Sequence, residues 1–449
     1  MKNKKLLNLV VAFATLGSVV GCNFGGNTSS SGEQSAKAGT IKVWVGGESV
    51  DFYTAQLAEY KKANPDFPHN FDVKGVDAGD AASTFLADKD AGADIFTIPH
   101  DNVGKLTAGT PVIAPISDAG LLAQIDADNP DAFKDVIKSK VGGKEYTFAV
   151  PYISQALVLY YNKSKVTAEQ AKTWEGLMEA AKAAGANVKA TTTVGTDLYN
   201  FSWPLLSTEV GTGKTTVELY KNASAENCNV DGDDTVAIMK WTQDFYKNPN
   251  GAKYLGDTSW EQETKAGNVL SIIGGAWNFN AAQASFGENN VGVTVLPTFT
   301  ITEGYGSVKA GTKFQAGTFA DCKAFVVKNG STYGSYLNDV VKFLSSKEVQ
   351  EKSFQECNNL PAYKNAATEF AGMTGDTVEA KLAQAQINMF EHGIAQPFGY
   401  DTSFNANYYS STVSTLYNFI VTNDDNSVST YEAIKAELQT IETYLKTGK

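Results

Sequence analysis

Short strand-like runs of apolar residues alternate with longer helix-like patterns along the chain from residue 41 onward. The first strand is predicted at residues 41–45 (IKVWV), and Tyr53, Leu57 and Tyr60 then recur at the spacing of one helix face, up to Pro65. Strands that alternate with helices favour an α/β fold with mainly parallel sheets. Further strands are predicted at residues 94–98, 156–161, 269–273, 291–296 and 324–327, and further helices at residues 169–184 and 235–246.

The C-terminal region carries a clear amphipathic helix pattern. Ser429, followed by Glu432 three residues later, is typical of a capping box at a helix start. The apolar residues that follow share one helix face: Ile434, Leu438, Ile441 and Leu445. We therefore predict a final helix that packs this face on the core.

The first 39 residues have the pattern of an export signal followed by a tether. Lysines precede an uncharged apolar run over residues 6–20, which predicts a secretory signal peptide at residues 1–21. Val-Val-Gly-Cys at residues 19–22 resembles a bacterial lipobox, so we expect a lipid on Cys22; a chance cysteine after an ordinary signal peptide is the alternative. Residues 22–39 are rich in Gly, Ser and Asn and predict a flexible tether. The protein is therefore expected outside the cytoplasm, anchored to the cell membrane by this lipid.

Length and charge restrict the number of domains and the kinds of partner. The roughly 410 residues beyond the tether exceed one ordinary core and suit two lobes. A net charge of −12 makes nucleic acid and anionic lipid surfaces poor partners. All 37 basic residues are lysine. Because phosphate and dicarboxylate sites usually use the arginine fork, this suits a neutral ligand, although a lysine-rich genome would give the same composition.

The sequence predicts neither a metal site nor a cofactor. The three histidines lack metal-ligand spacing: His69, His100 and His392. Beyond Cys22 the cysteines contain no Cys-x-x-Cys pair: Cys228, Cys322 and Cys357. An oxidising exterior permits a disulfide, and Cys322 with Cys357 is the candidate pair, which sequence separation alone cannot establish.

Six segments resemble, in order, the maltose- and maltodextrin-binding proteins, a branch of the extracellular sugar-binding proteins of ABC importers. They are IKVWV with Gly-Gly-Glu at residues 41–48, ADIF leading to His-Asp at 93–101, AVP leading to Tyr-Asn-Lys at 149–163, FSWPL at 201–205, GGAW at 274–277 and GVTVLPTF at 292–299. The resemblance implies two α/β lobes of the periplasmic-binding-protein type, joined by a hinge near Ile153, Pro297 and Leu360-Pro361. The expected lobes are residues 40–153 with 301–361, and residues 154–300 with 362–449.

The same resemblance implies a sugar-binding site. A sugar ring presents an apolar face to flat aromatic side chains and a rim of hydroxyls to carboxylates and amides. Trp277 falls on a stacking tryptophan of the family, and Gln155 on a glutamate beside the hinge. Asp101 and Glu48 fall on acidic partners for sugar hydroxyls, although Asp101 could instead cap the helix that follows it.

Other positions depart from the family pattern. Tyr199 and Asn200 precede Trp203 where the family places an aromatic residue on the ligand, so one of them is expected there, whereas Trp203 and Trp44 themselves are expected in the core. A family tryptophan is replaced by Ile98, which indicates a different chain length or a different oligosaccharide. The last stacking tryptophan has several candidate replacements: Tyr400, Phe404 and Tyr408, with Asn407 beside them.

We therefore predict an extracellular solute-binding lipoprotein, a monomer that captures a maltodextrin-type oligosaccharide, closes around it by a hinge motion and delivers it to an ABC permease. Another neutral oligosaccharide is the first alternative, and a charged peptide or polyamine is a further one. The Tyr408-Tyr409 pair also resembles ferric-ion-binding proteins, but these use basic groups to hold an anion beside the metal. A secreted glycosidase needs two carboxylates at a defined separation, and no pattern marks such a pair, so no enzyme activity is expected.

Overall fold

The computed structural model describes residues 38–193, 198–219, 228–254, 259–370, 373, 375–396, 407–421 and 428–447. The predicted signal peptide, Cys22 and all but the last two residues of the tether lie outside the described residues, as do Tyr400 and Phe404. Within the described ranges, no helix combines the length and apolar character needed to cross a bilayer. From Gly39 onward the chain forms a single compact unit.

A six-stranded mixed sheet organises the first lobe, in the order β16–β15–β3–β1–β2, with β6 paired to β15. β1 is parallel to β2 and β3, whereas β15 runs antiparallel to β3 and β6. A small hairpin of β4 and β5 lies outside this sheet. The strands are β1 (Thr40–Val45), β2 (Asn70–Gly75), β3 (Ile95–Pro99), β4 (Lys138–Val141), β5 (Lys144–Thr147), β6 (Ala149–Gln155), β15 (Phe319–Val327) and β16 (Ile394–Ala395). Of these, β16 pairs with the start of β15, and its Ile394 packs against the core of the second lobe.

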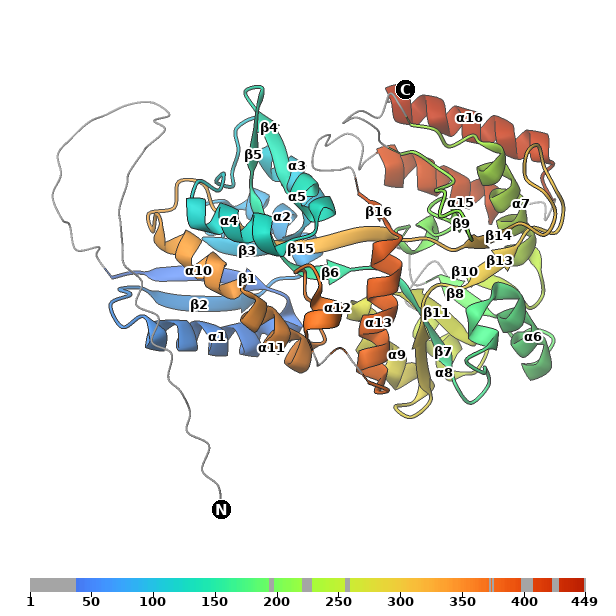
Figure 1. Cartoon of the computed structure of the whole chain (residues 1–449), viewed down its shortest axis with the longest axis horizontal. Helices are drawn as coiled ribbons and strands as arrows, with labels where there is room; N and C mark the ends of the chain where they lie inside the picture. Colours follow the sequence, from blue (N-terminus) through green and yellow to red (C-terminus); the bar gives the residue numbers. More distant parts are fainter. Residues whose placement is uncertain are drawn as a thin grey trace, which may run out of the picture. The chain divides into compact units, whose positions relative to one another are not determined.

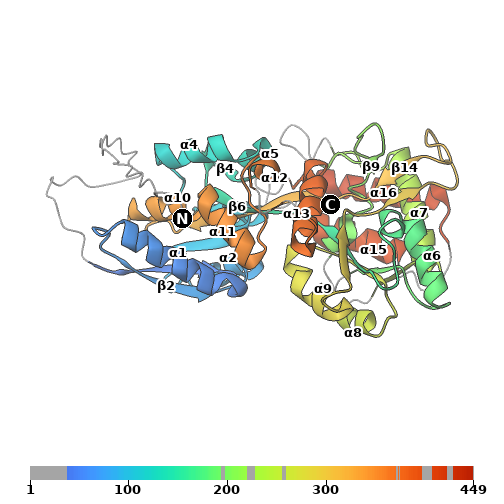
Figure 2. The same ribbon diagram turned by 60° about the horizontal axis from the view of Figure 1, so that its bottom comes forward.

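Helix α1 of this lobe follows the predicted pattern. It buries Tyr53, Leu57 and Tyr60 and ends at Ala63, just before Pro65, which cannot continue a helix. In Figures 1 and 2, helices α1, α10 and α11 gather beside β1 and β2. The helices of the lobe are η1 (Gly47–Ser49), α1 (Val50–Ala63), α2 (Ala78–Ala87), η2 (His100–Asn102), α3 (Val103–Thr107), α4 (Ala119–Asp128), α5 (Asp131–Val136), α10 (Tyr336–Leu344), α11 (Lys347–Cys357) and α12 (Ala366–Glu369).

The second lobe is built on a five-stranded mixed sheet in the order β10–β8–β11–β7–β12. β8 is parallel to β10 and β11, whereas β7 runs antiparallel to β11 and β12. A second, three-stranded sheet is ordered β13–β14–β9. The strands are β7 (Val158–Asn162), β8 (Thr191–Thr193), β9 (Thr208–Glu209), β10 (Ala252–Tyr254), β11 (Ser271–Gly274), β12 (Val291–Thr294), β13 (Thr298–Thr300) and β14 (Lys313–Gln315).

Helix α16 ends this lobe and buries the four apolar residues predicted for its inner face. Its cap is Thr430 rather than Ser429, because the Thr430 hydroxyl accepts the amide hydrogen of Ala433 at 3.2 Å. The helices of the lobe are η3 (Gln170–Lys172), α6 (Trp174–Ala184), η4 (Asn200–Ser202), α7 (Asp233–Lys247), α8 (Trp260–Lys265), η6 (Ala276–Asn278), α9 (Phe279–Phe286), α13 (Val378–Glu391), the π-helix η9 (Asn407–Val413), α15 (Ser414–Ile420) and α16 (Tyr431–Thr447).

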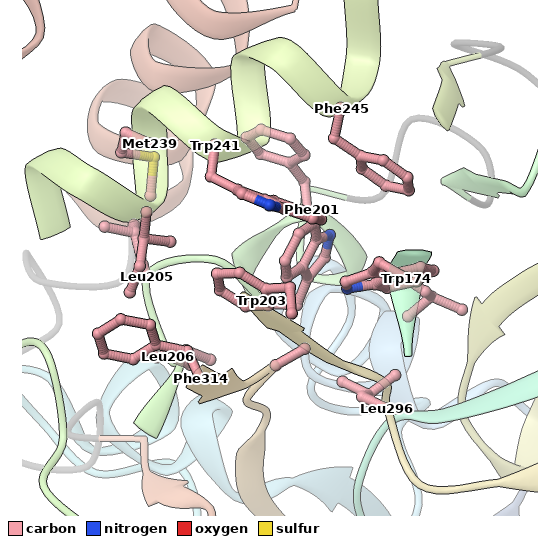
Figure 3. Packing of buried hydrophobic residues seen from close by; sticks show 14 of the residues in the cluster. Trp174, Phe201, Trp203, Leu205, Leu206, Met239, Trp241, Phe245, Leu296 and Phe314 are labelled. Carbon is pink, nitrogen blue, oxygen red and sulfur yellow. The ribbon is translucent and has the colours of Figure 1, made fainter. Parts of the chain in front are cut away.

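Aromatic rings fill the core of the second lobe (Figure 3). The ring centroids of Trp174 and Trp203 lie 5.4 Å apart, and those of Trp241 and Phe245, both on α7, lie 5.1 Å apart. Trp203 is fully buried and Trp44 is buried in the first lobe, so both expected core positions are confirmed. These close ring contacts give the second lobe a densely packed core.

Strands β6 and β15 run between the cores of the two lobes (Figure 1). Ile153 packs in the first core and Ala156 in the second, which agrees with the expected crossing near Ile153. The Ser154 amide donates to the Leu360 carbonyl at 2.8 Å, so the 360–361 segment also lies at the hinge.

The crossing expected near Pro297 lies elsewhere. Residues 299–319 contribute Phe299, Phe314 and Phe319 to the second core, and Cys322 is the first residue beyond them in the first core. The chain therefore crosses at Ala320–Asp321 within β15, because β13 and β14 first return to pair beside β9. The assignment of residues 301–319 to the first lobe is corrected accordingly.

The two-lobed α/β fold is confirmed, but both sheets are mixed rather than mainly parallel. The predicted strands at residues 94–98, 156–161, 269–273 and 291–296 correspond to β3, β7, β11 and β12 within three residues, and the helix at 235–246 to α7. The run at 324–327 is only the end of the nine-residue β15. The antiparallel pairs involve the hinge strands and the strand that follows them. In the first lobe β15 pairs antiparallel with β6, and in the second lobe β7, which follows β6 in the chain, pairs antiparallel with β11 and β12.

Candidate functional site

A cavity of about 670 Å³ lies where strands of both lobes end. The first lobe contributes the segment after β3, the second lobe the segment after β11, and the hinge strands β6 and β15 contribute the floor. Ligands of α/β proteins characteristically bind at such strand ends. The lining residues are Asp77, Gly79, Pro99, His100, Asp101, Asn102, Gln155, Leu198, Tyr199, Trp277, Asp321, Lys323, Gln396 and Tyr409.

Trp277 is held at this cavity by the glycine turn that precedes it. A Cβ atom on Gly275 would collide with the Trp277 ring, so only glycine lets the indole fold back over this turn. The turn is fixed on both sides, because the Gly275 amide donates to Asn278 Oδ1 at 3.2 Å and its carbonyl accepts from the Tyr160 hydroxyl at 2.8 Å. Trp277 is nevertheless 43% exposed, which is unusual for so large an apolar side chain.

Tyr199 provides a second aromatic surface next to Trp277. The two ring centroids are 6.2 Å apart, with an angle of 52° between the ring planes. Tyr409, from the π-helix η9, adds a third ring to the lining. The cavity therefore offers several aromatic faces on the side of the second lobe.

The first lobe supplies the polar rim. Asp101 lies in η2, directly after β3, and its Oδ1 accepts from Asn102 Nδ2 at 3.2 Å. Asp77 caps α2 by accepting from the Gly79 amide at 2.8 Å. With Asp321 and one lysine, Lys323, in the lining, acidic groups outnumber basic ones, so the site disfavours anions.

Asp321 is the centre of a buried polar cluster, which we call the Asp321 cluster: Asp321, His100, Tyr199 and Gln396. Its Oδ2 accepts from the Tyr199 hydroxyl at 2.6 Å and from Gln396 Nε2 at 2.8 Å. Its Oδ1 lies 3.8 Å from His100 Nε2. Burial raises the pKa of Asp321 to about 6, and nearby Asp101 adds to this rise, whereas His100 and the two hydrogen bonds oppose it.

The structure brings four of the predicted site residues to this cavity: Trp277, Asp101, Gln155 and Tyr199. Four others do not line it. Glu48 is exposed in η1, Asn200 is buried, Asn407 is partly buried, and Tyr408 is 0% exposed in the core of the second lobe.

Several lining residues were not anticipated as ligand contacts: His100, Asn102, Asp321, Lys323, Gln396 and Tyr409. His100 and Asn102 are the sequence neighbours of Asp101, so the prediction that Asp101 lies at the cavity already implies that they lie near it. Asp321 is an acid within the strand sequence FADCKAFVV, and an acid in an apolar strand is a signal for a special site. Gln396 follows the short strand β16, and no local pattern singles it out.

The suspected Cys322–Cys357 disulfide is absent. Cys228, Cys322 and Cys357 are all free thiols. Cys322 is fully buried on β15, whereas Cys357 lies half-buried at the end of α11. In the part of the chain that the structure describes, no group of three or more His, Cys, Asp or Glu side chains could hold a metal ion.

Two α/β lobes joined by hinge strands, with a cavity of aromatic and polar side chains at the strand ends, define a solute-binding protein. The chain belongs to the family of bacterial extracellular solute-binding proteins, whose family model matches residues 55–384. Members of this family bind solutes rather than transform them, so the protein is a binding protein and not an enzyme.

Individual relatives are more distant. The galactooligosaccharide-binding protein of Bacillus subtilis (strain 168) is 23% identical over 377 residues, which cover 81% of this chain and 82% of the relative. The maltodextrin-binding protein MalE1 from L. casei BL23, solved without ligand, has a TM-score of 0.69 and 21% identity, covering 91% of this chain and 99% of that one. MalX from Streptococcus pneumoniae, in complex with maltopentaose, has a TM-score of 0.65 and 18% identity over 90% and 99% of the two chains. Both structures establish the fold.

Proposed function

We propose that this protein captures a neutral oligosaccharide of the maltose or maltodextrin type outside the cytoplasm and delivers it to an ABC importer. The observation that carries the proposal is Trp277, a tryptophan that is 43% exposed at a cavity opposite the acidic rim. A sugar ring would cover its flat apolar face while the ring hydroxyls donate to Asp101 and accept from Asn102.

The charges of the cavity support an uncharged, hydroxyl-rich ligand over an anion. Among the described residues that line the cavity there are three aspartates, Asp77, Asp101 and Asp321, and one lysine, Lys323. The names of the relatives support an oligosaccharide, and they leave two sugar classes to test, since one binds galactooligosaccharide and others maltodextrins. A ferric ion is less well supported, because Tyr408 lies in the core and leaves Tyr409 as the one phenol of that pair at the cavity.

Ligand capture would act through the hinge. The cavity is lined from both lobes and from the strands that join them, so a ligand that contacts both lobes stabilises a closed arrangement. The permease would recognise this closed form. Lipid attachment at Cys22 would keep the protein beside the permease, and Cys22→Ser should release it into the medium of expressing cells.

Calorimetric titration of residues 40–449 with maltotriose, and in parallel with a galactotriose, tests the proposal. We expect binding of at least one of the two sugars, with a smaller radius of gyration in small-angle scattering at saturation. Trp277→Ala should weaken binding by about tenfold or more, which corresponds to roughly 1.4 kcal/mol. The matched control is Val210→Ala, since Val210 is an exposed apolar residue outside the cavity lining. Absence of binding to these and a wider set of neutral glycans would refute the proposal.

A further inference from the structure

Three buried polar atoms at the cavity have no hydrogen-bond partner among the described residues: His100 Nε2, Asp321 Oδ1 and Gln396 Oε1. These residues are 1%, 6% and 4% exposed, and all three line the cavity. Buried polar atoms in folded proteins nearly always have partners, so three unsatisfied atoms on one cavity floor require an explanation. A bound ligand would supply the missing partners.

Two hydrogen bonds to the other carboxylate oxygen, Oδ2, hold the Asp321 side chain in place. Tyr199 and Gln396 both donate to Oδ2, at 2.6 and 2.8 Å, and leave Oδ1 directed toward His100. Tyr199 comes from the second lobe, His100 from the first lobe and Asp321 from the hinge strand β15. A ligand group bound between His100 and Asp321 therefore contacts the hinge directly and the first lobe at the same time.

The distance between His100 Nε2 and Asp321 Oδ1, 3.8 Å, is too long for a hydrogen bond but allows one oxygen atom to lie within hydrogen-bond distance of both. His100 Nδ1 lies 3.4 Å from both the amide nitrogen and the carbonyl oxygen of Cys322. The neighbouring carboxylate favours the hydrogen on Nε2, with Nδ1 accepting from the Cys322 amide. The pair then presents one donor and one acceptor.

A hydroxyl group matches this pair, because it donates to Oδ1 and accepts from Nε2–H. An ammonium group would satisfy Oδ1 but leave Nε2–H without an acceptor, and a carboxylate would be repelled by Asp321 and Asp101.

We propose that His100 and Asp321 together bind a single hydroxyl group of the sugar at the floor of the cavity and so determine which sugar ring is accepted there. This inference rests on the proposed function, since it assigns a specificity-determining contact within the same site. Tyr199 and Gln396 act as positioning residues that orient the Asp321 carboxylate.

The test combines three variants with modified ligands. Asp321→Asn removes the charge at nearly constant size, and His100→Leu removes the donor, whereas His100→Gln retains a donor near the position of Nε2. Binding is measured by calorimetry with maltotriose, or with the galactotriose if that sugar binds more tightly, and with singly deoxygenated derivatives of the same sugar. Asp376→Asn, at a fully exposed carboxylate, is the matched control, and thermal unfolding verifies that each variant folds.

We expect Asp321→Asn and His100→Leu to weaken binding by about tenfold to a hundredfold, as for a lost charge-assisted hydrogen bond, with partial recovery in His100→Gln. One deoxygenated derivative should bind less tightly than the parent sugar to the wild type but equally to Asp321→Asn, a pattern that a purely structural role would not produce.

Two results would overturn the inference while leaving the proposed function intact. In one, the variants bind the parent sugar and every derivative with the wild-type pattern. In the other, a glucosamine trisaccharide binds more tightly than either neutral sugar, which would assign the pair to an ammonium group. A wild-type protein that binds no glycan would instead overturn the proposed function, and this inference with it.

Discussion

Tyr408 and Tyr409 are adjacent in the π-helix η9, with ring centroids 5.0 Å apart and ring planes at 84°, yet their rings occupy different environments. Tyr408 is 0% exposed and packs in the core of the second lobe, where its ring centroid lies 5.6 Å from that of Phe319. Tyr409 lines the cavity. Neighbouring side chains of a helix point in different directions, and here only Tyr409 faces the cavity.

This difference predicts opposite effects of the same substitution at the two positions. Tyr409→Ala should weaken sugar binding with little effect on the unfolding temperature, because it removes an aromatic face from the cavity. Tyr408→Ala should instead lower the free energy of unfolding by about 3–5 kcal/mol, as for other large core aromatic residues. Calorimetric titration and chemical denaturation distinguish the two results, and a stable Tyr408→Ala variant with impaired binding would contradict the assignment.

The sequence predicted those parts of the fold that depend on local periodicity. The faces of α1 and α16 are periodic, and the same residues are buried in the structure. The crossing at Ala320–Asp321 depends on the pairing of β14 with β9, about a hundred residues earlier in the chain, and no local pattern encodes such a contact.

In the candidate site, too, the residues that depend on contacts between distant segments could not be predicted from local patterns. Trp277 and Asp101 could be placed because their segments resemble the sugar-binding family, and each lies just after a strand in the structure. Tyr408 was a candidate from the family pattern alone; in the structure it lies in the core, and its neighbour Tyr409 lines the cavity. Asp321 differs from a surface acid in lying within an apolar strand, but its place at the cavity depends on Tyr199 and Gln396 from distant segments, which no local pattern encodes.

The Asp321 cluster predicts that sugar binding depends on pH. Burial raises the pKa of Asp321 to about 6, so the carboxylate loses its charge as the pH falls through this value. Protonation of Oδ1 would remove the acceptor for the ligand hydroxyl, and affinity should fall between pH 7 and pH 5. His100, Asp101, Lys323, Tyr199 and Tyr409 also face this part of the cavity, so Asp321→Asn is the control: its residual binding should lose most of the pH dependence.

The same shift predicts that Asp321 lowers the stability of the protein at neutral pH. A carboxyl group whose pKa is raised in the folded state binds protons there more tightly than in the unfolded state, so its unfavourable contribution grows as the pH rises from about 4 to 6. Asp321→Asn should therefore increase the free energy of unfolding at pH 7 by up to about 3 kcal/mol, and by much less at pH 4. Urea denaturation at the two pH values measures this difference, and equal stability changes at both would contradict it.

His69 should make the stability of the protein depend on pH in the opposite way to Asp321, so that stability falls as the pH falls. It is buried against Phe67, Tyr333 and Tyr336, and neither ring nitrogen has a hydrogen-bond partner in the described part of the chain. Burial lowers the pKa of His69 below its ordinary value of 6.5, so the unfolded state takes up the proton first as the pH falls. Stability should decrease below about pH 6.5. His69→Phe keeps the aromatic packing without the titration, so its unfolding temperature should fall less between pH 7.5 and pH 5.5; an equal fall would assign the acid sensitivity to other groups.

Gly275 provides the sharpest test of whether the position of Trp277 matters for binding. A Cβ atom there would collide with the Trp277 ring, while the backbone angles of Gly275, φ −93° and ψ −174°, are accessible to any residue. Gly275→Ala should therefore displace the indole without straining the backbone, and sugar affinity should fall by about tenfold. The unfolding temperature should change little, because the displaced ring is already exposed. Gly232→Ala is the matched control, since a Cβ atom there meets no neighbour within 4 Å. If Gly275→Ala binds sugar as tightly as the wild type while Trp277→Ala does not, the indole contributes apolar surface but its observed orientation is not the one that the ligand requires.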